Sequence, residues 1–381
     1  MTQFQIIATI GPASRNLAVV EKLIQSGMKM ARLSMAHDNY SAHERTISFV
    51  REACQQFGIS IPILQDLQGP KLRIGKINVK LSKGQGVILT PVEHPDSTEE
   101  KQSSQNIGKE APAFKHGVIP KSVHIPLIGD IHQYVKMGDL VLINNGIVQL
   151  EVKEVHGIST VCEVKYGGVV RTEKGVNLPM TNLPTKAITS KDKEDLAFGL
   201  QHQVEWIALS FVKSANDITE LREWLLKQNP KRMPLVMSKI ETREAIENLS
   251  QIIEASDAVM VARGDMALEI SFTKLPFLQK WIIAECRSLG KPVIVATDFM
   301  DSMCHRHVPS RAEVMDVANA FLDGATGLLL CQETAVGHYP VETVEMVSSI
   351  LSEVKAKGQD GKMAKWQACP LALLPPCHFA I

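Results

Sequence analysis

The chain has 381 residues, which is more than one ordinary compact core needs and is enough for a large barrel with a smaller appended domain. Hydrophobic residues make up 45% of the sequence and charged residues 22%, an ordinary balance for a soluble globular protein. Lysine plus arginine equal aspartate plus glutamate at 41 each. The molecule as a whole therefore has no net charge to attract nucleic acid or an anionic membrane, and we expect neither as a partner.

The N-terminus, the apolar runs and the cysteines of the sequence bear on where in the cell the protein is expected. The N-terminus lacks the basic and apolar regions of a signal peptide, and no apolar run approaches the roughly 18 to 20 residues that cross a bilayer. The 7 cysteines are odd in number and include no CxxC pair. We therefore expect reduced thiols and a cytoplasmic location, with neither a disulfide framework nor a zinc site.

Short apolar runs alternate with longer amphipathic stretches along most of the chain. The apolar runs predict strands at 5–9, 29–33, 61–67, 206–209, 234–240, 258–261, 293–296 and 327–330. The stretches that follow them predict helices at 17–26, 42–57, 191–201, 215–227, 243–255, 275–288, 311–322 and 341–355. Near-continuous apolar strands indicate burial on both faces and hence a parallel sheet. Eight such units in a row fit a closed (β/α)8 barrel, the TIM-barrel fold, better than an open sheet.

One connection breaks this rhythm. Between Arg73 and about Ile188 the helical period is replaced by alternating, strand-like segments, and Asn145-Gly146 is a strong hairpin signal. We expect a small β-rich lid domain inserted after the third strand, over the mouth of the barrel. Such a lid could exclude water from a site at the carboxyl ends of the strands.

The expected domain limits follow from this break. Residues 1–75 and 175–355 form the barrel, residues 76–174 form the lid, and residues 356–381 form a C-terminal tail. The tail contains an apolar run that is either a disordered end or a strip over the barrel surface. We favour the strip, because that much exposed apolar surface would promote association.

Polar residues follow the predicted strands at the edge where barrel enzymes place their sites. Lys239 and Glu241 lie at i and i+2 on one face of the fifth strand, and Arg263 and Asp265 repeat this spacing one strand later. Two carboxylates suit a hard divalent cation, and the lysine and arginine suit an anionic substrate. Gly264 leaves room for backbone N–H groups to approach an oxyanion. The alternative is a pair of structural ion pairs, which we disfavour because the charges converge.

Other residues are weaker candidates. The stretch Gly69-Pro-Lys-Leu-Arg73 is equally well a turn into the inserted domain. His37 could be a satisfied loop histidine, and Lys174 could be a solvated linker charge.

Several stretches together resemble the signature sequences of pyruvate kinases, in the order that this family has them. They span about residues 5 to 355 and include Thr9-Ile-Gly-Pro-Ala-Ser14, Ala31-Arg-Leu33, Lys174-Gly-Val-Asn-Leu-Pro179, Ser238-Lys-Ile-Glu241, Val261-Ala-Arg-Gly-Asp265, Arg311-Ala-Glu313 and Asp316-Val-Ala-Asn-Ala320. The joint match is specific because no single stretch has to decide it.

The resemblance implies a role for each candidate residue. Lys239 would lie beside the transferring phosphoryl group and stabilise the enolate, and Arg32 would neutralise phosphoryl charge. Thr297 would help to deliver a proton to the enolate carbon. Glu241 and Asp265 would hold Mg²⁺ or Mn²⁺.

The resemblance also implies how substrate and nucleotide are bound. The backbone of Ala262, Arg263, Gly264 and Asp265 would hold the substrate carboxylate. The residues bordering ADP or ATP would be Pro12, His37, Arg73 and Lys174.

The sequence departs from the family pattern where relatives bind potassium. In the stretches Arg32-Leu-Ser-Met-Ala-His37 and Asp66-Leu-Gln-Gly-Pro-Lys71, the family's Asn, Ser and Thr that would help to bind the ion are replaced by Ser34, Ala36 and Leu67. Lys71 stands where potassium-independent relatives also carry lysine, so its ammonium is expected to replace the ion, and potassium is not expected to be needed. The alternative is that Lys71 is a solvated turn residue that points away.

The resemblance further implies that the family's C-terminal domain is absent. We therefore expect a homodimer through the barrel, using the region 311–320, rather than a tetramer through that domain.

Three functions remain open. The first is phosphoryl transfer between phosphoenolpyruvate and ADP, giving pyruvate and ATP. The second is a metal-dependent lyase or decarboxylase that forms a pyruvate enolate without nucleotide, and the third is a non-catalytic binding paralogue. The third is disfavoured by the joint presence of Lys239, Glu241, Asp265, Arg32 and Thr297. The first is favoured over the second by Arg73 and Lys174.

Overall fold

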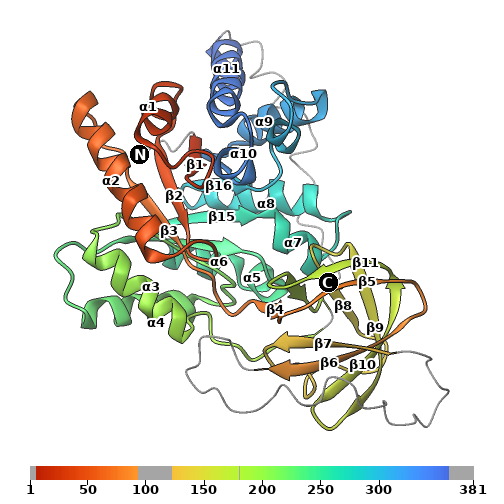
Figure 1. Ribbon diagram of the computed structural model, residues 1–381. Coiled ribbons are helices and arrows are strands. Elements are labelled where there is room, and N and C mark those ends of the chain that lie inside the picture. The colour runs from red at the N-terminus through yellow and green to blue at the C-terminus, as the bar shows by residue number, and fades with distance from the viewer. Residues whose placement is uncertain (1–5, 93–121, 180, 360–381) are drawn as a thin grey trace.

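The computed structural model describes residues 6–92, 122–179 and 181–359, and its largest unit is a closed barrel of eight parallel strands (Figure 1). Around the barrel the strands follow the order β1-β17-β16-β15-β14-β13-β3-β2. They are β1 (Ile6–Thr9), β2 (Met30–Ser34), β3 (Ile63–Asp66), β13 (Trp206–Leu209), β14 (Leu235–Ile240), β15 (Ala258–Ala262), β16 (Val293–Ala296) and β17 (Gly327–Leu330). The predicted (β/α)8 barrel is confirmed, and all eight predicted strands are present.

Helices cover the outside of this barrel. They are α1 (Leu17–Gln25), α2 (Tyr40–Phe57), α3 (Ser190–Gln201), α4 (Ala215–Lys227), α5 (Arg243–Glu247), α6 (Leu249–Ala255), α8 (Leu275–Ser288), α9 (Arg311–Asp323) and α11 (Pro340–Gln359). The last helix continues to Gln359 instead of ending at residue 355, and the rest of the predicted tail, 360–381, lies outside the described residues. In the described ranges no helix combines the length and apolar character that crossing a membrane needs.

One predicted helix is divided, and three short ones were not predicted. The stretch 243–255 is interrupted at Asn248, whose side chain donates a hydrogen bond to the carbonyl of Lys213 at 2.9 Å instead of lying on a continuous helix. The additional short helices are α7 (Arg263–Glu269), the 3-10 helix η1 (Asp301–Cys304) and α10 (Gln332–Ala335). They lie beyond the carboxyl ends of β15, β16 and β17, where they help to shape one rim of the barrel.

Two apolar layers hold the barrel together. One fills its interior and includes Ile7, Met30, Leu64, Met260 and Ile294, all fully buried. The other lies between the strands and the surrounding helices. Burial on both sides explains why the strands are mostly apolar, and it fixes the polar residues toward their carboxyl ends relative to one another.

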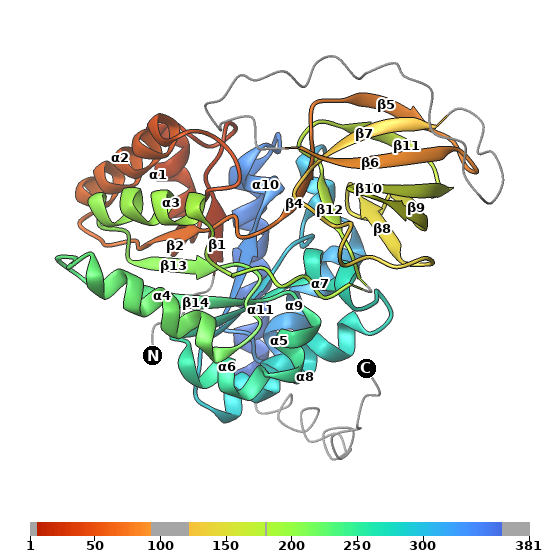
Figure 2. The same ribbon diagram turned by 90° about the horizontal axis from the view of Figure 1, so that it is seen from below.

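The segment between β3 and α3 forms a second, all-β barrel, so the predicted insertion after the third strand is confirmed (Figure 2). Its elements are β4 (Leu72–Ile74), β5 (Asn78–Leu81), β6 (Gly86–Val92), β7 (Val123–Ile128), β8 (Leu140–Ile143), β9 (Val148–His156), β10 (Ser159–Tyr166), β11 (Gly168–Arg171) and β12 (Gly175–Asn177). Seven of them close in the order β10-β6-β7-β4-β12-β8-β9, and β11 pairs with β5. This unit has its own buried apolar cluster.

The hairpin signal at Asn145-Gly146 marks a real turn between β8 and β9. Both residues have positive φ, 56° and 77°, and the N–H of Ile147 donates to the carbonyl of Asn144 at 3.2 Å. These values are those of the type I′ turn that suits the twist of a hairpin. The predicted domain limits stay a prediction, although β4 and β12 both pair inside the second barrel.

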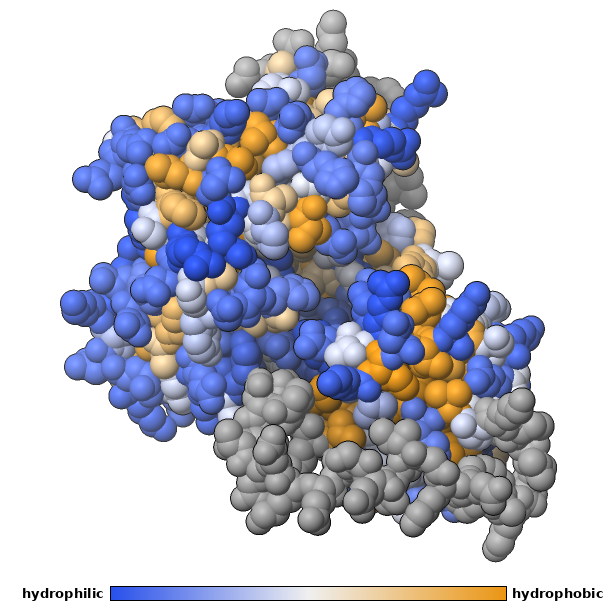
Figure 3. Space-filling view, in the orientation of Figure 1, coloured by the Kyte–Doolittle hydropathy of each residue, from blue (hydrophilic) through white to orange (hydrophobic). Residues whose placement is uncertain are grey.

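The surface of the face seen in Figure 1 differs between the two units. Hydrophilic side chains dominate over the parallel barrel, whereas apolar side chains gather on part of the second barrel (Figure 3). The surface is hollowed where the two units meet.

Candidate active site

Lys239 is the centre of a charged cluster at the carboxyl end of the parallel barrel. Its Nζ atom lies 3.0 Å from Oε1 of Glu241 and 3.2 Å from Oδ1 of Asp66, and it donates to Oγ of Ser210 at 2.8 Å. These partners come from the ends of three strands, β14, β3 and β13. The predicted convergence of polar strand ends is therefore present in the structure.

The charges of this cluster stabilise one another. Burial lowers the pKa of Lys239, but the carboxylates of Asp66 and Glu241 outweigh burial, so the net shift is upward. Burial raises the pKa of Asp66, but Lys239 and Arg32 outweigh it and the net shift is downward. The lysine is thus held as an ammonium and the aspartate as a carboxylate, even though Asp66 is only 2% exposed.

Arg32, on β2, is fixed beside this cluster. Its Nε donates to Oδ2 of Asp66 at 2.8 Å, and its Nη1 donates to Oγ1 of Thr9 at 2.9 Å. Sγ of Cys331 lies 4.0 Å from Nη1, and burial raises the pKa of this thiol to about 11, so it is neutral near pH 7. The guanidinium is therefore held in one orientation next to Lys239, an arrangement suited to a phosphoryl group.

Glu241, which is buried, and Asp265, which is partly buried, form a pair of carboxylates. Oε2 of Glu241 accepts the N–H of Phe211 at 2.8 Å, and the side chain is 1% exposed. Burial raises the pKa of Glu241, and although Lys239 opposes that shift, the nearby charge of Asp265 adds to it, so the net shift is upward. No group of three or more potential metal-binding side chains occurs among the described residues. Two carboxylates still fit Mg²⁺, which takes its other ligands from water and substrate oxygens.

Lys71 reaches the second of these carboxylates from the segment between β3 and β4. Its Nζ lies 2.6 Å from Oδ1 of Asp265, and it also lies 5.9 Å from the centre of the Phe211 ring. A Cβ atom on Gly175 would come within 2.7 Å of its Cε, so the lysine stem lies closely against β12. The alternative that Lys71 is a solvated turn residue pointing away is therefore wrong.

The side chain of Arg263 does not face the carboxylate pair, contrary to expectation. Its guanidinium turns toward β16 and α9, where Nε donates to the carbonyl of Thr297 at 3.0 Å and Nη1 pairs with Oδ2 of Asp316 at 2.7 Å. The i, i+2 spacing of Arg263 and Asp265 does not put their side chains on one face, because β15 ends at Ala262 and both residues belong to helix α7. The expected binding of a carboxylate by the backbone of Ala262 to Asp265 stays a prediction.

The residues expected to border a nucleotide come from both units, Arg73 and Lys174 from the second barrel and Pro12 and His37 from the loops after β1 and β2. Nη1 of Arg73, on β4, donates to the carbonyl of Glu173 at 2.9 Å. Burial lowers the pKa of His37, and the charges of Arg73 and Arg32 lower it further, so the ring is neutral near pH 7. Lys174 precedes β12 and Pro12 follows β1, both exposed. Their nucleotide roles stay predictions.

Asn177 and Glu269 are site residues that the sequence reasoning missed. Nδ2 of Asn177, at the end of β12, lies 3.3 Å from Oδ1 of Asp265 and 3.2 Å from Oε1 of Glu269. Burial raises the pKa of Glu269 to about 7. Both residues line a cavity of about 70 Å³ together with Lys71 and Phe211. Asp265 and Glu269 are four residues apart, and on a helix this spacing puts both side chains on one face. Recognising α7 as a helix would therefore have placed Glu269 beside Asp265.

A parallel barrel whose carboxyl-end rim holds a partly buried lysine, an arginine and two carboxylates belongs to the class of (β/α)8-barrel enzymes. The model of the pyruvate kinase barrel domain matches residues 1–344. The chain is 38% identical over 352 residues to the pyruvate kinase of Thermococcus litoralis, covering 91% of this chain and 68% of that protein. It is 39% identical to pyruvate kinase 2 of Synechocystis sp. over 92% of this chain and 56% of that protein. For the pyruvate kinase of Staphylococcus aureus the identity is 37%, over 95% and 58% of the two chains.

The chain therefore belongs to the pyruvate kinase family. It spans between 56% and 68% of the length of these three relatives.

Proposed function

We propose that the chain transfers the phosphoryl group of phosphoenolpyruvate to ADP, giving pyruvate and ATP. The observation that carries this proposal is the convergence of Lys239, Arg32 and the carboxylates of Glu241 and Asp265 at one rim of the barrel. Phosphoryl transfer needs little covalent chemistry from the protein, and it depends on positioning and on neutralising charge. These four groups supply both.

Each cationic side chain has a specific task in this proposal. The guanidinium of Arg32, fixed by Asp66 and Thr9, neutralises the oxygens of the phosphoryl group. The ammonium of Lys239 stabilises the enolate oxygen that remains when the phosphoryl group leaves. Its raised pKa favours this role, because the lysine stays charged throughout the physiological range. Thr297 helps to deliver a proton to the enolate carbon.

Glu241 and Asp265 would hold the divalent cation, Mg²⁺ or Mn²⁺. When bound, the cation would supply positive charge that offsets the negative charge of the substrate. Both carboxylates pair with lysines in this structure, Glu241 with Lys239 and Asp265 with Lys71. These ion pairs keep the carboxylates in place and offset their mutual repulsion.

The substrate and the nucleotide occupy neighbouring parts of the rim. The backbone from Ala262 to Asp265 binds the substrate carboxylate. The nucleotide lies beside Pro12, His37, Arg73 and Lys174, and the second barrel acts as a lid that limits access of water. Lys71 supplies the charge that a potassium ion would bring, so potassium is not required.

The test is the release of pyruvate from phosphoenolpyruvate, measured by a coupled assay with and without ADP. Pyruvate formed only with ADP and a divalent cation is the expected result. Pyruvate or its enolate formed from an oxaloacetate-like acid without nucleotide would favour the lyase instead. No turnover of either substrate, with intact folding, would favour a non-catalytic binding protein.

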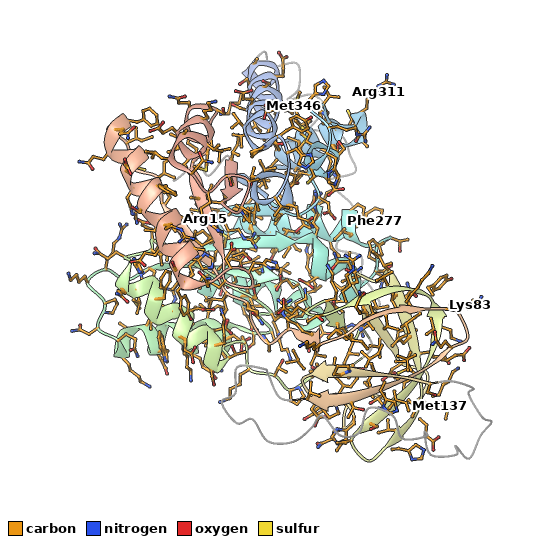
Figure 4. All side chains as sticks on the ribbon, viewed as in Figure 1. Arg15, Lys83, Met137, Phe277, Arg311 and Met346 are labelled. Carbon is orange, nitrogen blue, oxygen red and sulfur yellow. The ribbon has the colours of Figure 1, made fainter. Side chains whose placement is uncertain are left out.

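The same proposal extends to assembly and location. Helix α9 presents Met315, which is 60% exposed, and Arg311 lies on the outer side of the barrel (Figure 4), so we propose a homodimer through this region. Light scattering that gives the mass of a tetramer would contradict it. A cytoplasmic location is supported by the five described cysteines, all of which are free thiols, as expected in a reducing compartment.

A further inference from the structure

The backbone of Thr297 has an unusual conformation. Its φ is 82°, and the next residue, Asp298, has a φ of 58°. Positive φ is unfavourable for any side chain with a Cβ atom, and it is a genuine outlier for a β-branched residue such as threonine. Such a conformation persists only where the surrounding structure imposes it. The contacts of Thr297 should therefore identify the group that holds it.

Arg263 supplies the holding contacts. Its Nε donates to the carbonyl of Thr297 at 3.0 Å and to the carbonyl of Ala296 at 3.2 Å, and its Nη2 also donates to the carbonyl of Thr297. Two N–H groups of one planar guanidinium thus donate hydrogen bonds to the same carbonyl oxygen. A rigid fork of this kind sets the orientation of the peptide unit more firmly than a single donor can.

The guanidinium is itself fixed from two sides. Nη1 pairs with Oδ2 of Asp316 on α9 at 2.7 Å, and Cζ lies 4.1 Å from the centre of the Phe299 ring, which is fully buried. All three nitrogen atoms of the guanidinium therefore have protein partners. This arrangement explains why Arg263 is unsuited to bind a substrate anion directly.

Gly264, the residue after Arg263, also lies against Thr297. A Cβ atom on Gly264 would come within 3.3 Å of Cγ2 of Thr297, so the start of α7 lies directly against the Thr297 side chain. Two adjacent residues that follow β15 therefore contact Thr297, which follows β16. Arg263 donates to the Thr297 carbonyl, and Gly264 leaves space for the Thr297 side chain.

We propose that Arg263 is a positioning residue that holds Thr297 in its left-handed conformation and so directs the threonine hydroxyl for protonation of the enolate. This inference rests on the proposed function. In the step concerned, the electron pair of the enolate C=C bond takes a proton at the methylene carbon, forming a C–H bond. The C–O bond becomes the carbonyl of pyruvate, and the proton comes from the Thr297 hydroxyl, which regains one from water.

The decisive variant is Arg263→Met, which removes every donor but keeps a long side chain over Phe299. We expect kcat to fall by about 10- to 100-fold, in the range for loss of an aligned proton donor, while KM for phosphoenolpyruvate changes by less than about threefold. The incorporation of deuterium into the methyl group of pyruvate in D₂O should slow by the same factor. Arg263→Lys, which keeps the charge and one donor, should recover part of the loss.

The matched control is Arg222→Met. Arg222 also joins an aspartate and a backbone carbonyl on the outside of the barrel, since Nη2 bonds Asp257 at 2.8 Å and Ala255 O at 3.2 Å. Arg222 lies on α4 and, in the part of the chain that the structure describes, contacts none of the proposed site residues, so Arg222→Met should act independently of the site. We expect kcat and deuterium incorporation to stay within about twofold of wild type.

A double-mutant cycle separates positioning from a general structural role. If Arg263 acts through Thr297, then Arg263→Met should cost little further activity in a Thr297→Val background, because the group it positions is already gone. Effects that multiply would overturn the inference. So would a rise in KM with kcat unchanged, the signature of a substrate ligand.

A crystal structure of Arg263→Met tests the inference independently of turnover. Relaxation of Thr297 to negative φ supports it, and an unchanged left-handed Thr297 refutes it. An inactive wild-type protein would refute the proposed function, whereas the conformation of Thr297 in the variant would still decide whether Arg263 holds it.

Discussion

The ammonium of Lys71 lies 2.6 Å from Oδ1 of Asp265, so a residue that leads into the second barrel neutralises a carboxylate in the first turn of helix α7, just after strand β15. The contact joins two segments 194 residues apart in the sequence. Burial raises the pKa of Asp265, but Lys71 and Lys239 outweigh it, and the net shift is downward. A tethered cation therefore stands beside a carboxylate proposed to hold the metal.

The first prediction concerns this lysine. If Lys71 supplies the charge of a potassium ion, activity should be the same in potassium and in a bulky organic cation at equal ionic strength. Lys71→Glu should lower kcat/KM by at least about tenfold, as for loss of a charge near the transferred group, and added potassium should restore little of it. Steady-state kinetics in the two salts measure both effects. Several-fold activation of the wild type by potassium would contradict the idea.

The second prediction concerns Lys239. Lys239→Ala should lower kcat by at least about 10²-fold, because it removes a fixed stabiliser of developing negative charge. Circular dichroism should show intact secondary structure. The control is Lys280→Ala, since Lys280 also pairs with an aspartate but its side chain is 58% exposed. If the two variants lose activity equally, Lys239 has no special role in the chemistry.

The third prediction concerns the carboxylate pair. Glu241→Gln and Asp265→Asn should each weaken Mn²⁺ binding by at least about tenfold, because each removes one charged ligand. Electron paramagnetic resonance of free Mn²⁺ measures this without reference to activity. Glu151→Gln is the control, because Glu151 also pairs with lysines but belongs to the second barrel. Unchanged Mn²⁺ affinity in both site variants would exclude them as ligands.

The fourth prediction concerns Glu269 and pH. Burial raises its pKa from 4.5 to about 7. Because the folded protein favours the neutral carboxyl group, the contribution of Glu269 to the free energy of unfolding is fully present below the unfolded pKa near 4.5. This contribution is lost as the pH rises through 7. Glu269→Gln stays neutral, so relative to wild type it should gain stability between these two values. The gain above pH 7 should be on the order of 1 to 3 kcal/mol, since the side chain is partly exposed.

Thermal unfolding of both proteins across this range measures the difference. Their midpoints should converge near pH 4.5 and separate above pH 7. A constant difference at all pH values would show that Glu269 does not titrate as described.

The barrel and its main site could be predicted from the sequence because both follow from short-range periodicity. Near-continuous apolar strands predicted a parallel sheet, and the polar residues at the strand ends then had to share one rim, which brought Glu241 and Asp265 together. Asn145-Gly146 predicted its turn because its preference for positive φ is local.

The remaining features depend on contacts between distant segments. Nothing near Arg263 in the sequence indicates that Asp316 and Phe299 draw its side chain away from the rim, because strand alternation ends where α7 begins. The break at Asn248 likewise depends on a carbonyl of Lys213, which belongs to another βα unit. The raised pKa of Glu269 arises from burial beneath the second barrel, which no periodicity describes.

The pairing of β1 with β17 has a consequence for synthesis of the protein. Ile6 aligns with Leu328, and Thr9 Oγ1 donates to the carbonyl of Leu330 at 2.7 Å, across 321 positions of sequence. The first strand therefore lacks one of its two neighbours until nearly the whole barrel has left the ribosome. Contacts of such separation form late and slowly, whereas the inserted barrel has all its partners within 72–177 and can fold earlier. The edge of β1 that β17 covers in the folded barrel therefore stays unpaired until the last strand has been made.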